Sequence, residues 1–256
     1  MIYNLSKYLV SDLMRNKALW LNGLILFIFS YLINDLSSDS SKAAVSILNM
    51  NLMILPLFSI LISAIYYYSS KESMEFILTN PVSRFSVVVS IYLSLIIVLS
   101  LYYSVGIVIP TIIMNGTGYM VHVLVPGYLI ILIFSSVSVL SSVIFNDKVK
   151  GIAFAIFLWL FFAFVYDSLL ALVIFYFSDF NLEKILIVLI SLNPIDLYRI
   201  NTLLFLDTSA MMGFTSAFMK NLFGTTLSII STYVLMGVWV IIPFIVSLRL
   251  YARKSF

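Results

Sequence analysis

Long apolar runs constrain this chain more than any other feature of its sequence. Six of them are long enough to cross a membrane as α-helices, which takes about 20 residues each, and only 10% of the 256 residues are charged. The runs lack the alternation of polar and apolar residues that is typical of a transmembrane β-barrel. The sequence therefore predicts an all-α integral membrane protein with six transmembrane helices, at approximately Leu19–Leu36, Ile47–Ser69, Ser86–Ile109, Val123–Phe145, Gly151–Phe177 and Thr226–Leu248.

Lys and Arg are unevenly distributed between the two sides of these spans. Cytoplasmic connections of membrane proteins carry an excess of both residues. If the N-terminus is cytoplasmic, ten of them lie inside (Lys7, Arg15, Lys17, Lys71, Arg84, Lys148, Lys150, Arg249, Arg253 and Lys254) and four outside (Lys42, Lys184, Arg199 and Lys220). We therefore expect a multi-pass protein of the cytoplasmic (inner) membrane, with its N- and C-termini in the cytoplasm.

The sequence contains few residues that could perform catalysis or bind a metal. It has no Cys, one His (His122), and no P-loop, zinc-protease or nucleophile-elbow motif. Several Met residues fall on the predicted outer side without forming a Met-x-x-Met array: Met114, Met120, Met211, Met212 and Met219. We therefore expect a non-enzymatic subunit with no catalytic residue, metal site or cofactor of its own.

Residues 1–18 have the pattern of an amphipathic helix at the membrane surface. Apolar residues recur at three- and four-residue steps (Ile2, Leu5, Leu9 and Leu13), beside a polar stripe of the same spacing (Asn4, Lys7, Ser11 and Arg15). Such a helix lies in the headgroup layer with its cations near anionic lipid, so membrane lipid is an expected partner. A simple charged tail is the alternative interpretation.

The connection between the second and third spans, residues 70–85, has the pattern of a short helix. Ser69 and Glu72 have capping-box spacing, which predicts the start of a helix, and Asn80-Pro81 predicts its end. The polar residues that such a helix would expose are Lys71, Glu72, Glu75 and Arg84. Held between two spans, it could transmit force from a soluble partner, and a capped surface loop is the alternative.

A polar motif interrupts the long connection between the fifth and sixth spans, residues 178–225. The helix predicted over Asn181–Leu192 should end at Asn193, because a proline disfavours helical backbone in the residue before it. Pro194 and Asp196 would then occupy the first turn of a new helix, where both residue types are favoured. Tyr198 and Arg199 should project from this helix as a docking surface, and a purely structural lid is the alternative.

Asp167 is the charged residue placed deepest within a predicted span. It lies about 24 Å along the helix from Gly151, in the outer half of the membrane. An unpartnered carboxylate there costs about 2.5–3.5 kcal/mol. Arg199 is the nearest suitable cation by topology, so we consider a latch between them or a polar site in a dimer cavity. The alternative is a side chain bonded to Tyr166 or Ser168, or reaching water.

Six spans, the N-terminal helix and the stretch "ESMEFILTNPVSRFSVVVS" together resemble the membrane subunits of ABC transporters of the type-2 permease family. The resemblance covers the chain as a single domain, residues 1–256. It implies that residues 70–85 are the coupling helix, which docks in a groove of a separate cytoplasmic ATPase. The residues expected to carry this contact are Lys71, Glu72, Glu75, Phe76, Leu78, Pro81 and Arg84.

The stretch from Lys148 onward resembles a narrower group, the permeases of nitrous-oxide reductase maturation systems (the NosY type). The resemblance lies in Trp159 and Asp167 of the fifth span and in the later motif "LNPIDLYR". It implies a homodimer with two ATPase copies that carry ATP and magnesium, and a periplasmic β-helical copper-handling partner. The outer partner would contact Asn193, Pro194, Asp196, Tyr198 and Arg199.

On this resemblance the chain couples ATP hydrolysis to copper or sulfur delivery for nitrous-oxide reductase. Two alternatives stay open. One is an exporter permease for a peptide, lipid or drug, and the other is a membrane scaffold without an ATPase. No nucleic-acid partner is expected in any of these cases.

Overall fold

The protein is described by a computed structural model that covers residues 2–37, 39–71, 73–74, 83–115, 118, 120–177, 183–206 and 214–253. Every secondary-structure element in these ranges is a helix. In chain order they are α1 (Ile2–Met14), α2 (Lys17–Leu36), α3 (Ser40–Ser69), α5 (Arg84–Tyr103), η1 (Ser104–Val108), α6 (Ile109–Asn115), α7 (Val121–Ile144), α8 (Lys148–Leu160), η2 (Phe161–Val165), α9 (Tyr166–Tyr176), α10 (Glu183–Ser191), α11 (Pro194–Leu206) and α12 (Phe214–Arg253).

The described helices include six that are long and apolar enough to cross a membrane, which confirms the predicted fold class. They cover Leu19–Leu36, Ser40–Ser69, Arg84–Met114, Val121–Ile144, Lys148–Tyr176 and Thr226–Arg253. Most are longer than the predicted spans. The last helix, α12, begins at Phe214, within the stretch expected to be an outer connection.

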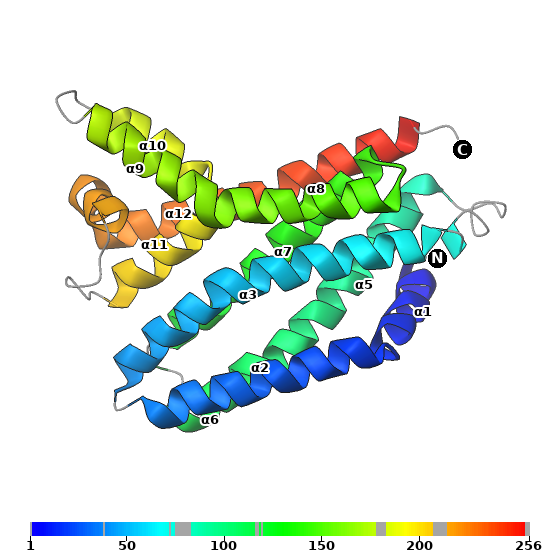
Figure 1. Ribbon diagram of the computed structural model, residues 1–256, viewed down its shortest axis with the longest axis horizontal. Coiled ribbons are helices and arrows are strands. Elements are labelled where there is room, and N and C mark those ends of the chain that lie inside the picture. The colour runs from blue at the N-terminus through cyan, green and yellow to red at the C-terminus, as the bar shows by residue number, and fades with distance from the viewer. Residues whose placement is uncertain are drawn as a thin grey trace.

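Both termini lie at the same end of the bundle (Figure 1). We call this the terminal end, and the opposite end, where α10 and α11 lie, the distal end. An even number of spans requires the termini to share a side, so this arrangement agrees with six crossings. That the terminal end faces the cytoplasm stays a prediction from the distribution of Lys and Arg.

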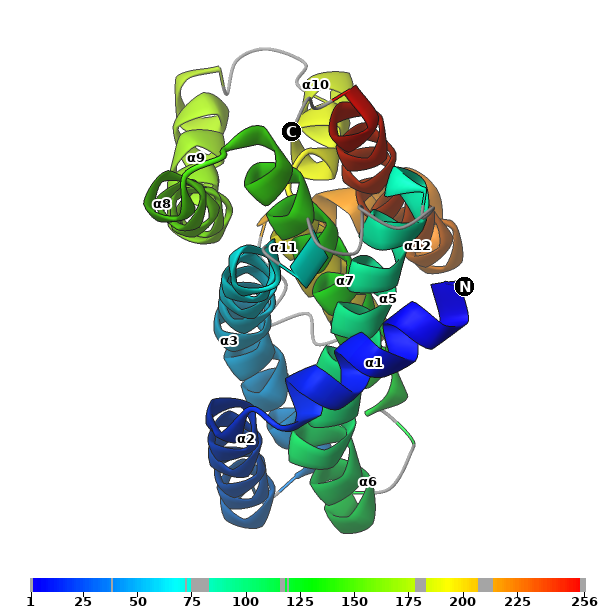
Figure 2. The same cartoon turned by 90° about the vertical axis from the view of Figure 1, so that its right-hand side faces the viewer.

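Helix α1 lies crosswise to the spans at the terminal end (Figure 2). Its apolar stripe is buried, with Leu9 and Leu13 in one cluster with Val87, Val88 and other residues of α5. Lys7 and Arg15 are exposed. The amphipathic pattern is therefore confirmed, but the apolar face packs on the protein itself, where the sequence suggested insertion among lipids.

The middle of the bundle is built around α7. The second half of this helix carries five small side chains that are all buried: Ser135, Ser136, Ser138, Ser141 and Ser142. Small residues let membrane helices approach closely, and their hydroxyls can bond to a neighbouring backbone. Ser138 does so, because its hydroxyl donates to the carbonyl of Ile60 on α3 at 2.6 Å. Helix α7 therefore contacts α3, α5, α8, α11 and α12.

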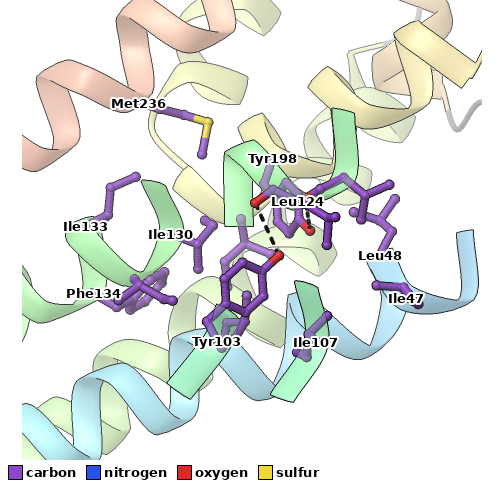
Figure 3. Close-up of a cluster of buried hydrophobic side chains, with 14 of the residues drawn as sticks. Ile47, Leu48, Tyr103, Ile107, Leu124, Ile130, Ile133, Phe134, Tyr198 and Met236 are labelled. Carbon is purple, nitrogen blue, oxygen red and sulfur yellow. Dashed lines mark hydrogen bonds between the residues drawn. The ribbon is translucent and has the colours of Figure 1, made fainter. Parts of the chain in front are cut away.

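A glycine in α7 makes room for one of the largest buried side chains. The Tyr103 hydroxyl lies against Gly127, where a Cβ atom would approach it to 2.2 Å. In the cluster of Figure 3, Tyr103 of span three and Tyr198 of α11 lie beside Leu124 of α7. Three segments far apart in sequence thus meet at this point of the core.

Candidate functional site

The chain bends sharply at the polar motif of the distal end. Helix α10 ends at Ser191, α11 begins at Pro194, and the two helix axes differ by 106°. The side-chain oxygen of Asn193 accepts a hydrogen bond from the backbone N–H of Ile195 at 3.0 Å, which caps α11. The predicted helix end at Asn193 and the predicted restart at Pro194 are therefore confirmed.

The amide group of Asn193 connects this bend to the fifth span. Its nitrogen donates to Asp196 at 3.0 Å and to the carbonyl of Phe162 at 3.1 Å. Phe162 lies in η2, a π-helical turn that divides the span into α8 and α9. A π turn changes the pattern of backbone hydrogen bonds, and such turns occur often at functional sites. Asn193 is fully buried and satisfies a carbonyl of this irregular turn.

Three charged side chains form one network beside this bend. The Arg199 guanidinium donates to Asp167 of α9 at 2.9 Å and also to Asp196, one turn earlier in α11. The Asp196 side chain is 1% exposed, whereas those of Arg199 and Asp167 are 33% and 37% exposed. The suggested latch between Asp167 and Arg199 is therefore present, and it joins α11 to the fifth span.

The alternative partners suggested for Asp167 are engaged elsewhere. The Ser168 hydroxyl donates to the carbonyl of Phe164 at 3.1 Å, and the Tyr166 hydroxyl donates to that of Leu189 on α10. Tyr166 therefore adds another connection between the fifth span and the α10–α11 segment. Trp239 connects the same segment to α12, because its indole nitrogen donates to the carbonyl of Ser191 at 2.9 Å.

Tyr198 points into the core, and the expectation that it projects outward is wrong for the single chain. It is fully buried, and its hydroxyl donates to the carbonyl of Val123 at 2.9 Å. It also accepts from the amide of Asn51 on α3 at 3.0 Å, and Asn51 donates to Tyr103 as well, at 3.3 Å. Helix α11 is enclosed on most of its faces, so spacing along the helix could not distinguish an outward from an inward position.

Of the five residues expected to contact an outer partner, Arg199 alone is not fully buried. Asn193, Pro194, Asp196 and Tyr198 are buried within the chain. Contact of a periplasmic protein with this motif stays a prediction, and these four side chains hold the hairpin in place rather than offering a surface.

The predicted coupling segment is described only in part. Glu72, Glu75, Phe76, Leu78 and Pro81 lie outside the described residues, while Lys71 is helical and half-buried. Arg84 begins α5 and donates to the carbonyl of Ala252 near the end of α12 at 3.3 Å. The segment between spans two and three is thereby joined at its end to the last span.

The capping box predicted for Ser69 and Glu72 stays a prediction, because Glu72 lies outside the described residues. Ser69 is the last residue of α3, and its hydroxyl donates back to the carbonyl of Ile65 at 2.9 Å. Ser70 is the C-cap of α3. Helix α3 therefore ends where the predicted span ends, and it differs from the prediction at its start, Ser40 rather than Ile47.

Asn51 is the functional candidate that the sequence reasoning missed. It is fully buried and lies within the apolar run of the second span. A lone amide in such a run is costly unless it is bonded, which is the signal that could have drawn attention to it. About 28 Å of continuous helix separates Asn51 from Ser70 at the end of α3.

The described part of the chain has no group of three or more His, Cys, Asp or Glu side chains that could hold a metal ion. His122, at the start of α7, stacks on Phe205 of α11. The arrangement is a set of helix-to-helix connections and contains no assembled catalytic group among these residues.

Comparison with known families identifies the chain. A family model described as ABC-2 family transporter protein matches residues 3–256, and no curated protein matches. Members of this family are typically non-catalytic membrane subunits that pair with a separate ABC ATPase subunit. The chain belongs to the ABC-2 transporter family and is a multi-pass membrane permease subunit of an ABC transporter.

Proposed function

We propose that this permease converts ATP hydrolysis on a partner ATPase into movement of the α10–α11 segment, and that this movement serves copper or sulfur delivery to nitrous-oxide reductase. In this proposal the terminal end is cytoplasmic and the distal end periplasmic. Two permease copies form a homodimer with two ATPase copies, and ATP and magnesium bind to the ATPase. A β-helical copper-handling protein receives the movement outside the membrane.

The hydrogen bond between Asn51 and Tyr198 is the observation that carries this proposal. Helix α3 is continuous over Ser40–Ser69 and leads directly into the predicted coupling segment, residues 70–85. In its distal half, Asn51 bonds to Tyr198 of α11 at 3.0 Å. A displacement of α3 by the ATPase would therefore act directly on the helix that carries the polar motif.

The fifth span supplies the second attachment of α11. Arg199 bonds to Asp167, and Asn193 bonds to the carbonyl of Phe162, so α11 is held between α3 and the span that contains η2. Relative movement of α3 and the fifth span must strain or exchange one of these attachments. The Asp167–Arg199 pair is one-third exposed and polar, which suits it to open and re-form.

The copper-related part of the proposal is supported by the resemblance of the motif at Leu192–Arg199 and of the fifth span to maturation permeases. The motif residues hold a bent hairpin that bonds to α3 and to the fifth span. A segment that is bonded to two spans moves when either span moves, which fits a mechanical delivery step. The same segment could serve as the gate of an exporter. Copper loading of the reductase and transport in vesicles distinguish these two functions.

A pull-down of the full-length chain from native membranes tests the coupling part. We expect an ABC ATPase to co-purify, and its recovery to fall on Glu75→Ala but not on Lys42→Gln, an exposed residue at the distal end. Recovery of the permease without any ATPase, from membranes that contain assembled transporters, would contradict the proposal.

Deletion of this chain in its native host tests the delivery part. We expect nitrous-oxide reductase to accumulate without copper, which metal analysis of the purified reductase measures. Normal copper loading would overturn this function. ATP-driven movement of a peptide, lipid or drug in vesicles that lack any outer partner would instead establish an exporter.

Tyr198→Phe tests the path through Asn51. We expect this variant to keep the ATPase bound and to lower reductase loading by on the order of fivefold or more, as for typical coupling energies between sites. Tyr92→Phe on α5 is the matched control, since this buried tyrosine donates to the carbonyl of Leu132 and lies outside the Asn51–Tyr198–Tyr103 network. Equal effects of the two variants would remove the support for this path.

A further inference from the structure

A cavity of about 640 Å³ opens at the terminal end of the molecule. It lies between α1, the start of α2 and the end of α3, and Figure 2 views this end with α1 lying across it. Its volume falls within the roughly 300–1,000 Å³ of small-molecule sites. The proposed coupling mechanism does not use this cavity.

The wall of the cavity is polar on one side and apolar on the other. Polar groups come from α1 and from the residues that follow α1 and α3, namely Asp12, Arg15, Ser70 and Ser73 among others. Apolar ones include Leu19, Ile62 and Ile65. Ile65 is 46% exposed, so the apolar side opens outward from the protein. A ligand that fills this cavity must itself be amphiphilic.

A narrow apolar crevice continues the cavity toward the middle of the membrane. It has a volume of about 30 Å³, lies between α2, α3 and α5, and shares Leu19, Asn22 and Ile62 with the larger cavity. Polarity therefore decreases from the terminal end inward. The same order, headgroup first and hydrocarbon second, is found along a phospholipid.

Aromatic residues beside the cavity indicate that it lies at the membrane surface. The Trp20 indole nitrogen donates to the carbonyl of Met14, at 2.8 Å, and 49% of this residue is exposed. Tyr66, at the end of α3, lines the cavity and donates to the carbonyl of Leu9 on α1 at 3.2 Å. Trp and Tyr concentrate at the level of lipid headgroups, where one part of the ring is wet and the other apolar.

The charges around the cavity favour an anion. Arg15 and Asp12 both line it, and the carboxylate of Asp12 accepts a hydrogen bond from the Tyr66 hydroxyl at 3.3 Å. Several cations lie at the helix ends of this face, whereas the acids there in the described residues are Asp12 and Asp147. The described cations in or next to the helices that meet at this end are Lys7, Arg15, Lys17, Lys71, Arg84, Lys148, Lys150, Arg249 and Arg253.

We infer that the cavity between α1, α2 and α3 binds one anionic phospholipid of the leaflet at the terminal end. The phosphate lies at Arg15, and an acyl chain follows the side formed by Leu19, Ile62 and Ile65. A bound lipid bridges α1 to the last turn of α3, which leads into the predicted coupling segment. This inference concerns the permease alone and does not depend on the proposed function.

Lipid retention by the full-length permease tests the inference. The purified chain is incorporated in nanodiscs of mixed phosphatidylglycerol and phosphatidylcholine, released, and analysed by native mass spectrometry. We expect one phosphatidylglycerol to be retained in preference to phosphatidylcholine. Arg15→Gln should lower this preference about fivefold, the size expected for one cation near an anionic headgroup.

Lys148→Gln is the matched control, because it removes the same charge at the same end but lies outside the cavity wall. Its preference should stay unchanged within about twofold. Equal losses in the two variants would mean that the general field of the surface selects the lipid, and the inference would be wrong.

Two further measurements address the apolar half of the cavity. Ile65→Ser should weaken retention of both lipids, since Ile65 is exposed and its replacement leaves the fold intact. Glycerol phosphate, which carries the anion without acyl chains, should not displace the retained lipid. Displacement by glycerol phosphate, or full retention in Ile65→Ser, would show an anion site without a lipid and would overturn the inference.

Discussion

The two ends of this molecule carry charges in opposite ways. At the distal end, Asp167, Asp196 and Arg199 bond to one another, and Asp196 is buried. At the terminal end, cations such as Lys7, Lys148 and Arg249 are exposed. Charges inside an apolar bundle must find partners within the chain, whereas exposed ones remain available to lipids and to other subunits. The charges of the Asp167–Asp196–Arg199 network therefore determine local structure, and the exposed ones at the terminal end determine interactions.

Arg199→Gln should give the largest effect on stability. It leaves the buried carboxylate of Asp196 and the nearby Asp167 without their shared cation. Breaking a buried ion pair by removing one partner costs about 3–5 kcal/mol. Thermal unfolding of the purified permease in detergent measures the loss. Arg249→Gln, the same substitution at an exposed terminal-end residue, is the control, and equal losses would break the contrast between the two ends.

Asn193→Ala should come next, with a loss of about 1–3 kcal/mol. The substitution leaves the Phe162 carbonyl and the N–H of Ile195 without this partner, and Asp196 loses one donor. The same unfolding measurement applies. Ser191→Ala is a suitable control beside the bend, because its hydroxyl bonds only to the carbonyl of Val188 in its own helix turn and the substitution keeps the backbone carbonyl that Trp239 uses. A loss within about 0.5 kcal/mol for Asn193→Ala would show that the bend does not need its cap.

The Asp167–Arg199 contact itself should contribute less, because both side chains are about one-third exposed. A double-mutant cycle of Asp167→Asn and Arg199→Gln isolates it, and we expect a coupling energy of about 1 kcal/mol. Strictly additive losses would mean that the contact contributes nothing to stability. The coupling energy should fall as the salt concentration is raised, because salt screens interactions between exposed charges.

The smallest effects are expected at the terminal end. Lys148→Gln and Arg15→Gln should each change the free energy of unfolding by no more than about 0.5 kcal/mol, because both side chains are exposed. Unfolding in detergent free of anionic lipid measures this, so that bound lipid does not contribute. A loss comparable with that of Arg199→Gln would show that terminal-end charges also hold the fold together.

Much of the fold was predictable because it follows from local pattern. The spans appear as apolar runs, Asn193-Pro194 breaks a helix for steric reasons, and the stripe of Leu9 and Leu13 has helical spacing. Span boundaries were less accurate, as at Ser40 and Phe214, since an apolar or neutral helix has no local reason to stop at the membrane surface.

The candidate site was predictable in its members and only partly in its geometry. Asp167 and Arg199 could be paired by topology, because a buried carboxylate needs a cation on the same side of the membrane. The inward direction of Tyr198 and the bond from Asn193 to Phe162 could not be predicted. They depend on which helices surround α11 and on a π turn that leaves no mark in the amino-acid pattern.

The sequence by itself determined that this chain crosses a membrane several times, where its helices bend, and which charges lie within the apolar region. These properties follow from the cost of exposing polar groups to hydrocarbon, which acts residue by residue. The tertiary structure alone decided that Asn51 reaches Tyr198, that α1 packs on α5, and that a cavity remains between α1, α2 and α3. Those features arise from packing between distant segments. Because lipid and protein surroundings are almost equally apolar, the local pattern of residues does not indicate which of the two an apolar side chain will contact.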